Sequence, residues 1–393
     1  MKATHLLLAA CVALTCDLPA RAIQISYSYD SAGRLTSASY GGAGNTTYQY
    51  DRNGNLLARV NTVNPFVPLA GTYAGLITGN GGSSAQAGFL SLNVTLTGGF
   101  SGTASFGGKK FKVKGSFDSN GDASIDLPGS PAVHLDLHLD AGTRQVTGAF
   151  TGGVTAMLTA SSAPFAKSKP APGGAVGKYS ALLAATESLA TVPKGTGFAN
   201  VTIGSTGSVK VAGVLADGTK LSQGTSLVSD TQWPLFATLY KNEGFISGLV
   251  SYAPNPGVGE FIGTIDWLKP AVPGGLYTAG FSTELDFSAA HYSAPSKGQR
   301  VLELSDDSPN AHFVAPGLDQ SITVDAANRV SVSDPNPEKL TLKVKAKSGK
   351  VSGSLLFDGK TRKFSGLLQL EQSVGAGFFF SDTESLPFEL SEN

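Results

Sequence analysis

The feature that most constrains this chain is a glycine at the centre of many short apolar segments. The pattern apolar-x-Gly-x-apolar recurs along the sequence, for example at residues 73–77, 146–150 and 351–355. Alternate side chains of a β-strand point to the same face, so each of these glycines lies between two apolar side chains. A glycine inside a strand costs roughly 0.5–1 kcal/mol, and sharp strand curvature or an aromatic ring over the gap compensates for that cost. The pattern therefore predicts strongly curved antiparallel sheets, closed or nearly closed around a filled interior.

Two segments far apart in the sequence predict the same β-hairpin. Residues 100–117 (FSGTASFGGKKFKVKGSF) and 351–368 (VSGSLLFDGKTRKFSGLL) align without a gap. In each segment, two alternating runs flank a short turn that contains glycine and is followed by lysine. Alternating runs on either side of such a turn are typical of a hairpin.

An ordered internal duplication indicates that the chain contains successive modules of one kind. GTYAGLI from Gly71 matches GKYSALL from Gly177, and GFLSLNVTLTGG from Gly88 matches GFANVTIGSTG from Gly197. A third stretch opens with GGLYTAGF at Gly274. Repetition in the same order indicates that each copy is one structural unit. Helical periodicity is nearly absent, so the predicted fold class is all-β, with curved antiparallel sheets that form small barrel-like or sandwich modules.

The expected domain boundaries follow from these repeats and from one linker. Residues 163–176 (APFAKSKPAPGGAV) are rich in proline, alanine, glycine and lysine without periodicity, which is typical of a linker. We expect a signal peptide at 1–22, paired hairpins at 23–65, a first β module at 66–162, the linker at 163–176, and a larger β domain at 177–393 with sub-repeats 177–272 and 273–393.

The composition fits an exported all-β protein. Hydrophobic residues make up 41% of the chain and charged residues only 15%, which disfavours intrinsic disorder. The 29 lysines and arginines balance the 29 aspartates and glutamates, so no net charge attracts nucleic acid or an anionic membrane surface. No run after the N-terminal segment reaches the ~18 apolar residues of a transmembrane helix.

The N-terminus has the pattern of a secretory signal peptide. An apolar core at residues 6–15 follows Lys2, and a small-x-small site ends at Ala22, after which we expect cleavage. The alternative is a lipoprotein signal in which Cys16 is acylated. Both cysteines of the chain, Cys11 and Cys16, lie inside this segment, so the mature chain would contain no thiol for a disulfide, a nucleophile or a metal site. The expected location is extracytoplasmic: secreted, on the cell surface or in the periplasm.

Residues 27–59 contain two copies of one motif. Tyr27, Tyr29, Asp30, Gly33, Arg34 and Leu35 recur as Tyr48, Tyr50, Asp51, Gly54, Asn55 and Leu56. The pattern YxYDxxG[RN]L resembles the YD repeat of RHS and teneurin proteins. That resemblance implies that each copy is a β-hairpin in a spiralling sheet, here a short annex to the β modules. The remaining glycine-rich modules resemble β-repeat segments of large exported bacterial proteins that have no assigned activity.

Two acidic segments are weak candidates for metal binding. His134, Asp136, His138 and Asp140 alternate with apolar residues, so all four project from one strand face. Neighbouring members lie ~6.8 Å apart, but His134 and His138 are ~13 Å apart and cannot share a tetrahedral zinc ion. The alternative interpretation is a solvated polar face.

A second candidate, with Asp118, Asn120, Asp122 and Asp126, has some of the oxygen ligands of a calcium loop. Its glycine, Gly121, precedes the third of these residues, whereas in an EF-hand the glycine follows the third ligand. Asn120-Gly121 between two apolar residues is also a strong hairpin-turn signal.

Four large aromatic residues are the candidate ligand-binding side chains: Trp233, Tyr240, Trp267 and Tyr277. When exposed, such residues form platforms for carbohydrates. The alternative is that they fill a barrel interior or close its end.

No recognisable catalytic or cofactor motif supports an enzymatic function. The sequence contains no GxSxG elbow, phosphate loop, dinucleotide fingerprint or HExxH motif, and we predict no cofactor. The preferred interpretation is an exported non-enzymatic β-repeat protein that serves as a binding or scaffold module, with a glycan or another surface protein as partner. Two alternatives remain open: a carbohydrate-active hydrolase whose carboxylates converge only in the folded chain, and an outer-membrane β-barrel. The sequence does not indicate an oligomeric state.

Overall fold

The computed structural model describes residues 25–40, 44–79, 87–128, 132–152, 155–228, 231–255, 259–296, 298–302 and 309–392. The expected signal peptide, with Cys11, Cys16 and Ala22, lies outside these residues. Within them, the regular elements are β-strands and single turns of 3₁₀ helix, and none of the helical turns is long and apolar enough to cross a membrane. The chain divides into two compact units, with the boundary between Val67 and Pro68.

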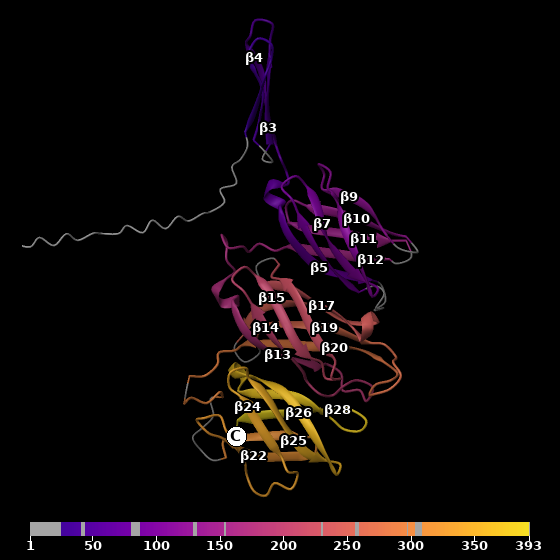
Figure 1. Cartoon of the computed structure of the whole chain (residues 1–393), viewed down its shortest axis with the longest axis vertical. Helices are drawn as coiled ribbons and strands as arrows, with labels where there is room; N and C mark the ends of the chain where they lie inside the picture. The colour runs from indigo at the N-terminus through magenta and orange to yellow at the C-terminus, as the bar shows by residue number, and fades with distance from the viewer. Residues whose placement is uncertain are drawn as a thin grey trace, which may run out of the picture. The chain divides into compact units, whose positions relative to one another are not determined.

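The first unit is a four-stranded antiparallel sheet, drawn in indigo in Figure 1. Its strands follow chain order: β1 (Ser26–Tyr29), β2 (Leu35–Ser39), β3 (Gly44–Tyr50) and β4 (Leu56–Val63). Gly33 and Gly54 end the turns of the two motif copies with φ values of +76° and +89°, a left-handed conformation that suits glycine. The two predicted hairpins are therefore present.

The second unit contains three nearly closed eight-stranded barrels (Figure 1). The first barrel consists of β5 (Gly71–Gly79), β6 (Gly88–Val94), β7 (Gly99–Phe106), β8 (Lys109–Ser116), β9 (Asp122–Leu127), β10 (Val133–Asp140), β11 (Gln145–Thr151) and β12 (Ala156–Ser162). The second consists of β13 (Gly177–Ala185), β14 (Gly197–Ile203), β15 (Ser208–Val214), β16 (Lys220–Ser226), β17 (Gln232–Leu239), β18 (Gly244–Asn255), β19 (Gly259–Lys269) and β20 (Phe281–His291). The third consists of β21 (Ala311–Ala315), β22 (Leu318–Val324), β23 (Val330–Val332), β24 (Thr341–Lys345), β25 (Lys350–Phe357), β26 (Lys360–Gln369), β27 (Val374–Phe380) and β28 (Ser385–Glu392).

The three barrels share most of their topology. In each, the strands run as an antiparallel meander and the first strand pairs with the eighth. The unpaired neighbours are the fourth and fifth strands in the first two barrels (β8/β9 and β16/β17) but the third and fourth strands, β23 and β24, in the third. We call the gap between these two unpaired strands the seam of each barrel. The prediction of an all-β fold built from curved, barrel-like antiparallel modules is confirmed.

The strand-centre glycines lie where the backbone of a neighbouring strand or an aromatic ring comes close. A Cβ atom on Gly75 of β5 would overlap the backbone of Thr159 and Ala160 on β12, and one on Gly263 would lie 2.6 Å from the Leu249 carbonyl oxygen. A Cβ on Gly115 would instead lie 2.7 Å from Cζ of Phe100, whose ring covers the gap. The expected covering aromatic ring is therefore present at Gly115, while Gly75 and Gly263 lie where a neighbouring strand approaches too closely for a side chain.

Large side chains fill the barrel interiors. Tyr73 and Phe150 are fully buried in the first barrel, Trp233 in the second, and Phe313 and Phe388 in the third. In the third barrel the Phe313 ring stacks against the Phe388 ring at a centroid distance of 5.3 Å. These interiors are packed cores and not open channels.

The internal duplication corresponds to equivalent strands. The matching segments from Gly71 and Gly177 form β5 and β13, the first strands of their barrels, and those from Gly88 and Gly197 form the second strands β6 and β14. The two matching hairpins occupy different positions, because β7–β8 are the third and fourth strands of the first barrel whereas β25–β26 are the fifth and sixth strands of the third. Their likeness therefore reflects the hairpin itself and not the place of the hairpin in a module.

Residues 177–393 form two separate barrels, and the boundary between them depends on the pairing of strands that are far apart in the sequence. The segment from Gly274 connects β19 to β20, and β20 completes the second barrel by pairing with β13, with Tyr179 opposite His291. The sequence placed the division between sub-repeats at 272/273, whereas the second sheet ends at His291 and the third begins at Ala311. The expected linker, residues 163–176, lies between β12 and β13.

Candidate functional site

The two candidate tryptophans lie inside the second barrel. Trp233 is fully buried, with its ring edge-on to Phe287 at 5.6 Å, and Trp267 is 1% exposed, with its ring edge-on to Phe281 at 4.7 Å. Both indoles therefore belong to the packed core, which was the alternative to an exposed carbohydrate-binding platform.

Tyr240 connects this interior to a polar turn. Its hydroxyl donates to Oδ2 of Asp217 at 2.7 Å and accepts a hydrogen bond from Nε1 of Trp267 at 3.0 Å. The ammonium of Lys269 lies 5.0 Å from the centre of the Tyr240 ring, within cation–π range. Burial, together with the nearby Asp217 carboxylate, raises the pKa of the Tyr240 hydroxyl well above its usual value. Tyr240 is therefore a neutral donor in a satisfied network.

Tyr277 contacts the third barrel. Its hydroxyl accepts a hydrogen bond from the backbone N–H of Ser385 at 2.8 Å, and its ring lies edge-on to Phe281 at 5.6 Å. Burial raises the pKa of the Tyr277 hydroxyl. Tyr240, Trp267 and Tyr277 therefore belong to one cluster, because Trp267 contacts both Tyr240 and Phe281, and Phe281 contacts Tyr277. Trp233 packs against Phe287 instead.

The segment with Asp118, Asn120 and Asp122 forms the turn before β9. Oδ1 of Asp118 accepts the backbone N–H groups of Asn120 and Asp122, both at 2.9 Å, and Gly121 has a φ of +86°. These bonds hold the pKa of the Asp118 carboxyl below its usual value. Among the described residues, no group of three or more His, Cys, Asp or Glu side chains is arranged to hold a metal ion.

His134 lies in a cross-strand cluster on the outer face of β9 and β10. Its Nδ1 is 2.7 Å from Asp126, its Nε2 is 2.7 Å from the Ser124 hydroxyl, and the same Nε2 is 3.2 Å from Asp136. The hydrogen bond to Asp126 is the main cause that raises the pKa of the His134 imidazole. On the same face, Nδ1 of His138 is 2.6 Å from Asp122.

The order Ser124, His134, Asp126 has the connectivity of a Ser–His–Asp triad, but its protons are placed differently. The Ser124 hydroxyl donates to Asp136 at 2.7 Å, so Nε2 of His134 must donate to the serine oxygen. Nδ1 must also donate, because Asp126 only accepts. When both nitrogens are protonated the ring is an imidazolium ion, which stabilises the two carboxylates and has no lone pair to activate a serine; the raised pKa of His134 favours this form. Sequence analysis missed Ser124, since only the β9–β10 register brings it opposite Asp136.

A cleft of about 400 Å³ lies at the seam of the second barrel. We call it the seam cleft. On one side β16 and β17 contribute Gln223 and Phe236, and on the other the β7–β8 hairpin of the first barrel contributes Lys109 and Lys110. The turn of that hairpin packs against the second barrel, because a Cβ on Gly108 would lie 2.6 Å from the Asn242 carbonyl oxygen.

A second, wider cleft of about 560 Å³ lies on the outer face of β5 to β8. We call it the outer cleft. Its polar side chains include Ser91, Asn93, Ser101, Thr103, Lys112 and Lys114. Sequence analysis did not single out these residues; the available signal was lysine at every second position of β8.

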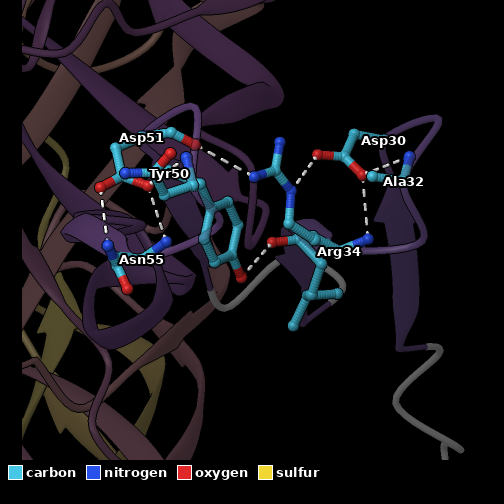
Figure 2. Close-up of polar contacts among 8 residues, drawn as sticks. Asp30, Ala32, Arg34, Tyr50, Asp51 and Asn55 are labelled. Atoms are coloured by element: carbon cyan, nitrogen blue, oxygen red, sulfur yellow. Dashed lines mark hydrogen bonds and ion pairs between the residues drawn. The ribbon is translucent and has the colours of Figure 1, made fainter.

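The first unit carries two equivalent turns, shown in Figure 2. Oδ1 of Asp30 accepts the backbone N–H groups of Ala32 and Arg34, both at 2.9 Å. In the second copy, Oδ1 of Asp51 accepts the N–H of Asn53 at 2.9 Å and that of Asn55 at 2.8 Å. These bonds from the backbone, together with those from the Arg34 and Asn55 side chains, hold the pKa of both carboxyls below the usual value.

Arg34 joins the two copies. Its Nε donates to Oδ2 of Asp30 at 2.7 Å, and its Nη1 reaches the Asp51 carbonyl oxygen at 3.2 Å (Figure 2). Its guanidinium lies 4.9 Å from the centre of the Tyr50 ring, and the Tyr50 hydroxyl donates to the Leu35 carbonyl oxygen at 3.0 Å. The motif residues thus form one continuous network across both hairpins.

The comparison with protein families matches this part of the chain to the family described as RHS Repeat, over residues 29–64. Residues 29–64 are an RHS repeat. The sequence prediction is therefore confirmed for this segment. The comparison with curated proteins gives no match.

Two solved structures are similar to the chain at low identity. Transferrin binding protein B of isotype 1 from serogroup B Neisseria meningitidis is 10% identical, with 89% of this chain and 84% of that chain covered and a TM-score of 0.21. An endo-1,5-alpha-L-arabinanase from Thermotoga petrophila is 9% identical, with 78% and 80% covered and a TM-score of 0.18. At these TM-scores neither similarity supports an inference about this chain.

The RHS repeat and the residues that flank it expose apolar side chains more densely than the barrels do. Of the fourteen large hydrophobic side chains exposed among the described residues, nine lie between Ile25 and Val67. On β4, Leu57 is 67% exposed and Val63 is 74% exposed. Among the described residues, exposed apolar side chains are thus concentrated in the first unit.

Proposed function

We propose that this protein is an exported, noncatalytic binding scaffold that takes its ligand on the outside of its barrels, and that glycans are its ligand class. The observation that carries this proposal is the filled interior of each barrel, including the burial of Trp233 and Trp267 in the second. Because the interiors are occupied by the protein's own side chains, in this proposal the ligand binds at the seam cleft, at the outer cleft or on the RHS repeat.

The chemistry of the two clefts supports a glycan ligand. The seam cleft combines the Phe89 ring with the Asn242 amide and the hydroxyls of Ser222 and Thr238. Sugars bind to such surfaces by stacking on an aromatic ring while their hydroxyls exchange hydrogen bonds with amide and hydroxyl groups. The outer cleft offers the same hydroxyl and amide groups along neighbouring strands.

The scaffold role rests on repetition and on the RHS repeat. Three eight-stranded antiparallel barrels form the support, and the RHS repeat presents exposed apolar side chains. In this proposal the RHS repeat contacts another surface protein while the barrels bind glycan.

The test for binding uses the purified full chain on a panel of neutral and acidic polysaccharides in affinity electrophoresis. We expect retardation by at least one polysaccharide and no release of reducing ends from any of them. Release of reducing ends would overturn the noncatalytic role in favour of a hydrolase, and no retardation on the panel would overturn the glycan ligand class.

Export is tested separately in a bacterial host that expresses the full chain. We expect the protein outside the cytoplasm and shortened by cleavage after Ala22. Accumulation of the uncut chain in the cytoplasm would contradict the proposed location, and lipid attachment at Cys16 would replace cleavage after Ala22 with the lipoprotein alternative.

A further inference from the structure

Edge strand β8 carries a ladder of lysines on its outer face. Lys110, Lys112 and Lys114 are exposed and alternate with the buried Phe111 and Val113. Alternate residues of a strand lie ~6.8 Å apart, so the three ammonium groups follow a line ~13 Å long. We call Lys109, Lys110, Lys112 and Lys114 the lysine track.

Lys110, Lys112 and Lys114 each end a transverse row of side chains on the outer face of the sheet. Across the β7–β8 pairing, Lys110 is opposite Ser105, Lys112 is opposite Thr103, and Lys114 is opposite Ser101. Neighbouring strands lie ~4.8 Å apart, so a hydroxyl column runs beside the ammonium column. On β6 the rows continue with an aromatic ring, a hydroxyl and an amide: Phe89, Ser91 and Asn93.

The lysine track connects the two clefts. Lys109 and Lys110 line the seam cleft, and Lys112 and Lys114 line the outer cleft. Among the described residues that line either cleft, none is acidic. The two clefts therefore form one basic, hydroxyl-rich path along β8.

The lysine track is available for a ligand, because the nearest acidic strand is already paired. On β9, across the seam of the first barrel, Asp122 contacts His138 at 2.6 Å and Asp126 contacts His134 at 2.7 Å. No carboxylate of the described residues lies within ion-pair distance of a lysine in the track. The positive charge of the track is thus not neutralised within the described part of the chain.

We infer that the lysine track and its two clefts bind a linear polysaccharide that carries carboxylates, a polymer of uronic acids. Carboxylates pair with the ammonium groups in charge-assisted bonds, and sugar hydroxyls meet the Ser and Thr column of β7. Phe89 supplies a ring for one sugar at the seam cleft. A zero net charge over the chain disfavours nucleic acid, whose binding depends on a strong positive field. This inference rests on the proposed function and names its ligand class.

The experiment compares the full chain on sodium polygalacturonate and on its fully methyl-esterified form, by affinity electrophoresis at low and high salt. We expect strong retardation by the charged polymer, which salt weakens, and little by the esterified polymer. The double variants K109Q/K110Q and K112Q/K114Q should each bind polygalacturonate roughly tenfold more weakly, since each loses two charge-assisted contacts.

Two further double variants control for net charge and for folding. K343Q/K345Q removes two exposed lysines at the same spacing from edge strand β24, outside both clefts, and should bind like the unmodified chain. K112R/K114R keeps the charge of the track and should retain binding, which separates loss of a contact from loss of the fold.

Four outcomes would overturn the inference. Equal binding of the charged and esterified polymers, or equal loss of binding in K343Q/K345Q, would remove the lysine track as the site while the proposed glycan-binding function stands. An absence of binding to every polysaccharide would overturn both. Binding of single-stranded DNA with the same dependence on Lys112 and Lys114 would replace the uronate polymer by a general polyanion.

Discussion

The backbone N–H of Phe236 donates to Oε1 of Gln223 at 3.0 Å, across the seam of the second barrel. The same side chain donates from Nε2 to the Pro234 carbonyl oxygen at 3.1 Å. Gln223 belongs to β16 and both backbone groups belong to β17, the two strands that do not pair with each other. The Gln223 side chain thus replaces some of the hydrogen bonds that direct pairing of β16 with β17 would provide. Pro234 has no N–H and lies on an edge strand, where proline is tolerated.

Replacing Gln223 by leucine should therefore destabilise the second barrel. The change leaves one backbone N–H and one backbone C=O without their partner, at a cost of about 1–3 kcal/mol. Chemical denaturation of the full chain, followed by tryptophan fluorescence, measures the loss, because Trp233 and Trp267 both lie in this barrel. Gln232→Leu is the matched control, since Nε2 of Gln232 bonds a side chain, the Ser251 hydroxyl at 3.1 Å, and no backbone group of the described residues. An equal loss in both variants would contradict the bridging role of Gln223.

The strand-centre glycines predict a steric contrast within one protein. Gly75→Ala should destabilise the first barrel by about 1–3 kcal/mol, because the added methyl overlaps β12 and the strands have to separate. Gly224→Ala on β16 adds the same methyl where no atom lies within 4 Å, so its stability should stay the same or rise by about 0.4–1 kcal/mol. Thermal melts of both variants give the comparison. A harmless Gly75→Ala would remove close strand approach as the reason for the glycine.

We expect the contacts of His134 with Asp126 and Asp136, which link β9 to β10, to weaken at higher pH. Asp126 raises the pKa of His134 above the ordinary value of 6.5, so the imidazolium is favoured in the folded state. Its contribution to stability is fully present below pH 6.5 and is lost as the pH rises through the raised folded pKa. The protection factors of the β9 amides, that is, their exchange rates corrected for the intrinsic effect of pH, should fall over that range. NMR titration of the His134 ring gives its pKa directly.

Asp126→Asn provides the control for this pH dependence. The variant removes the largest cause of the shift, so the pKa of His134 should move back toward 6.5 and the pH dependence of β9 exchange should diminish. An unchanged titration of His134 in Asp126→Asn would show that another group sets its pKa.

Arg34 predicts how the two hairpins of the RHS repeat are coupled. Arg34→Asn gives the first copy the residue that Asn55 supplies in the second, where Nδ2 of Asn55 bonds Oδ2 of Asp51 at 2.8 Å. The contact to Asp30 should therefore persist, while the bonds to the Asp51 carbonyl and the stacking on Tyr50 are lost. We expect faster amide exchange in the second turn, residues 51–55, with the first turn unchanged. Faster exchange in the first turn alone would contradict the coupling.

The structure also defines how much of the binding surface was predictable. The lysines of β8 alternate in the sequence, so their common face follows from strand geometry. Their meeting with Phe236 and Gln223 does not, because these residues belong to another barrel. For Trp233 and Trp267 the sequence left an exposed platform and core packing both open for the same reason: residue type does not distinguish a buried indole from an exposed one.

The sequence by itself determined the strands, the turns and the RHS repeat. Alternation, left-handed glycines and the Asp30 and Asp51 turns are all governed by contacts among residues a few positions apart, and such contacts can be inferred from the order of the residues. Only the tertiary structure decided the pairing of β13 with β20, the place of each seam, the cluster around His134 and the clefts at either end of the lysine track. These depend on which distant strands meet, and that choice is made by the packing of whole barrels and not by any local pattern.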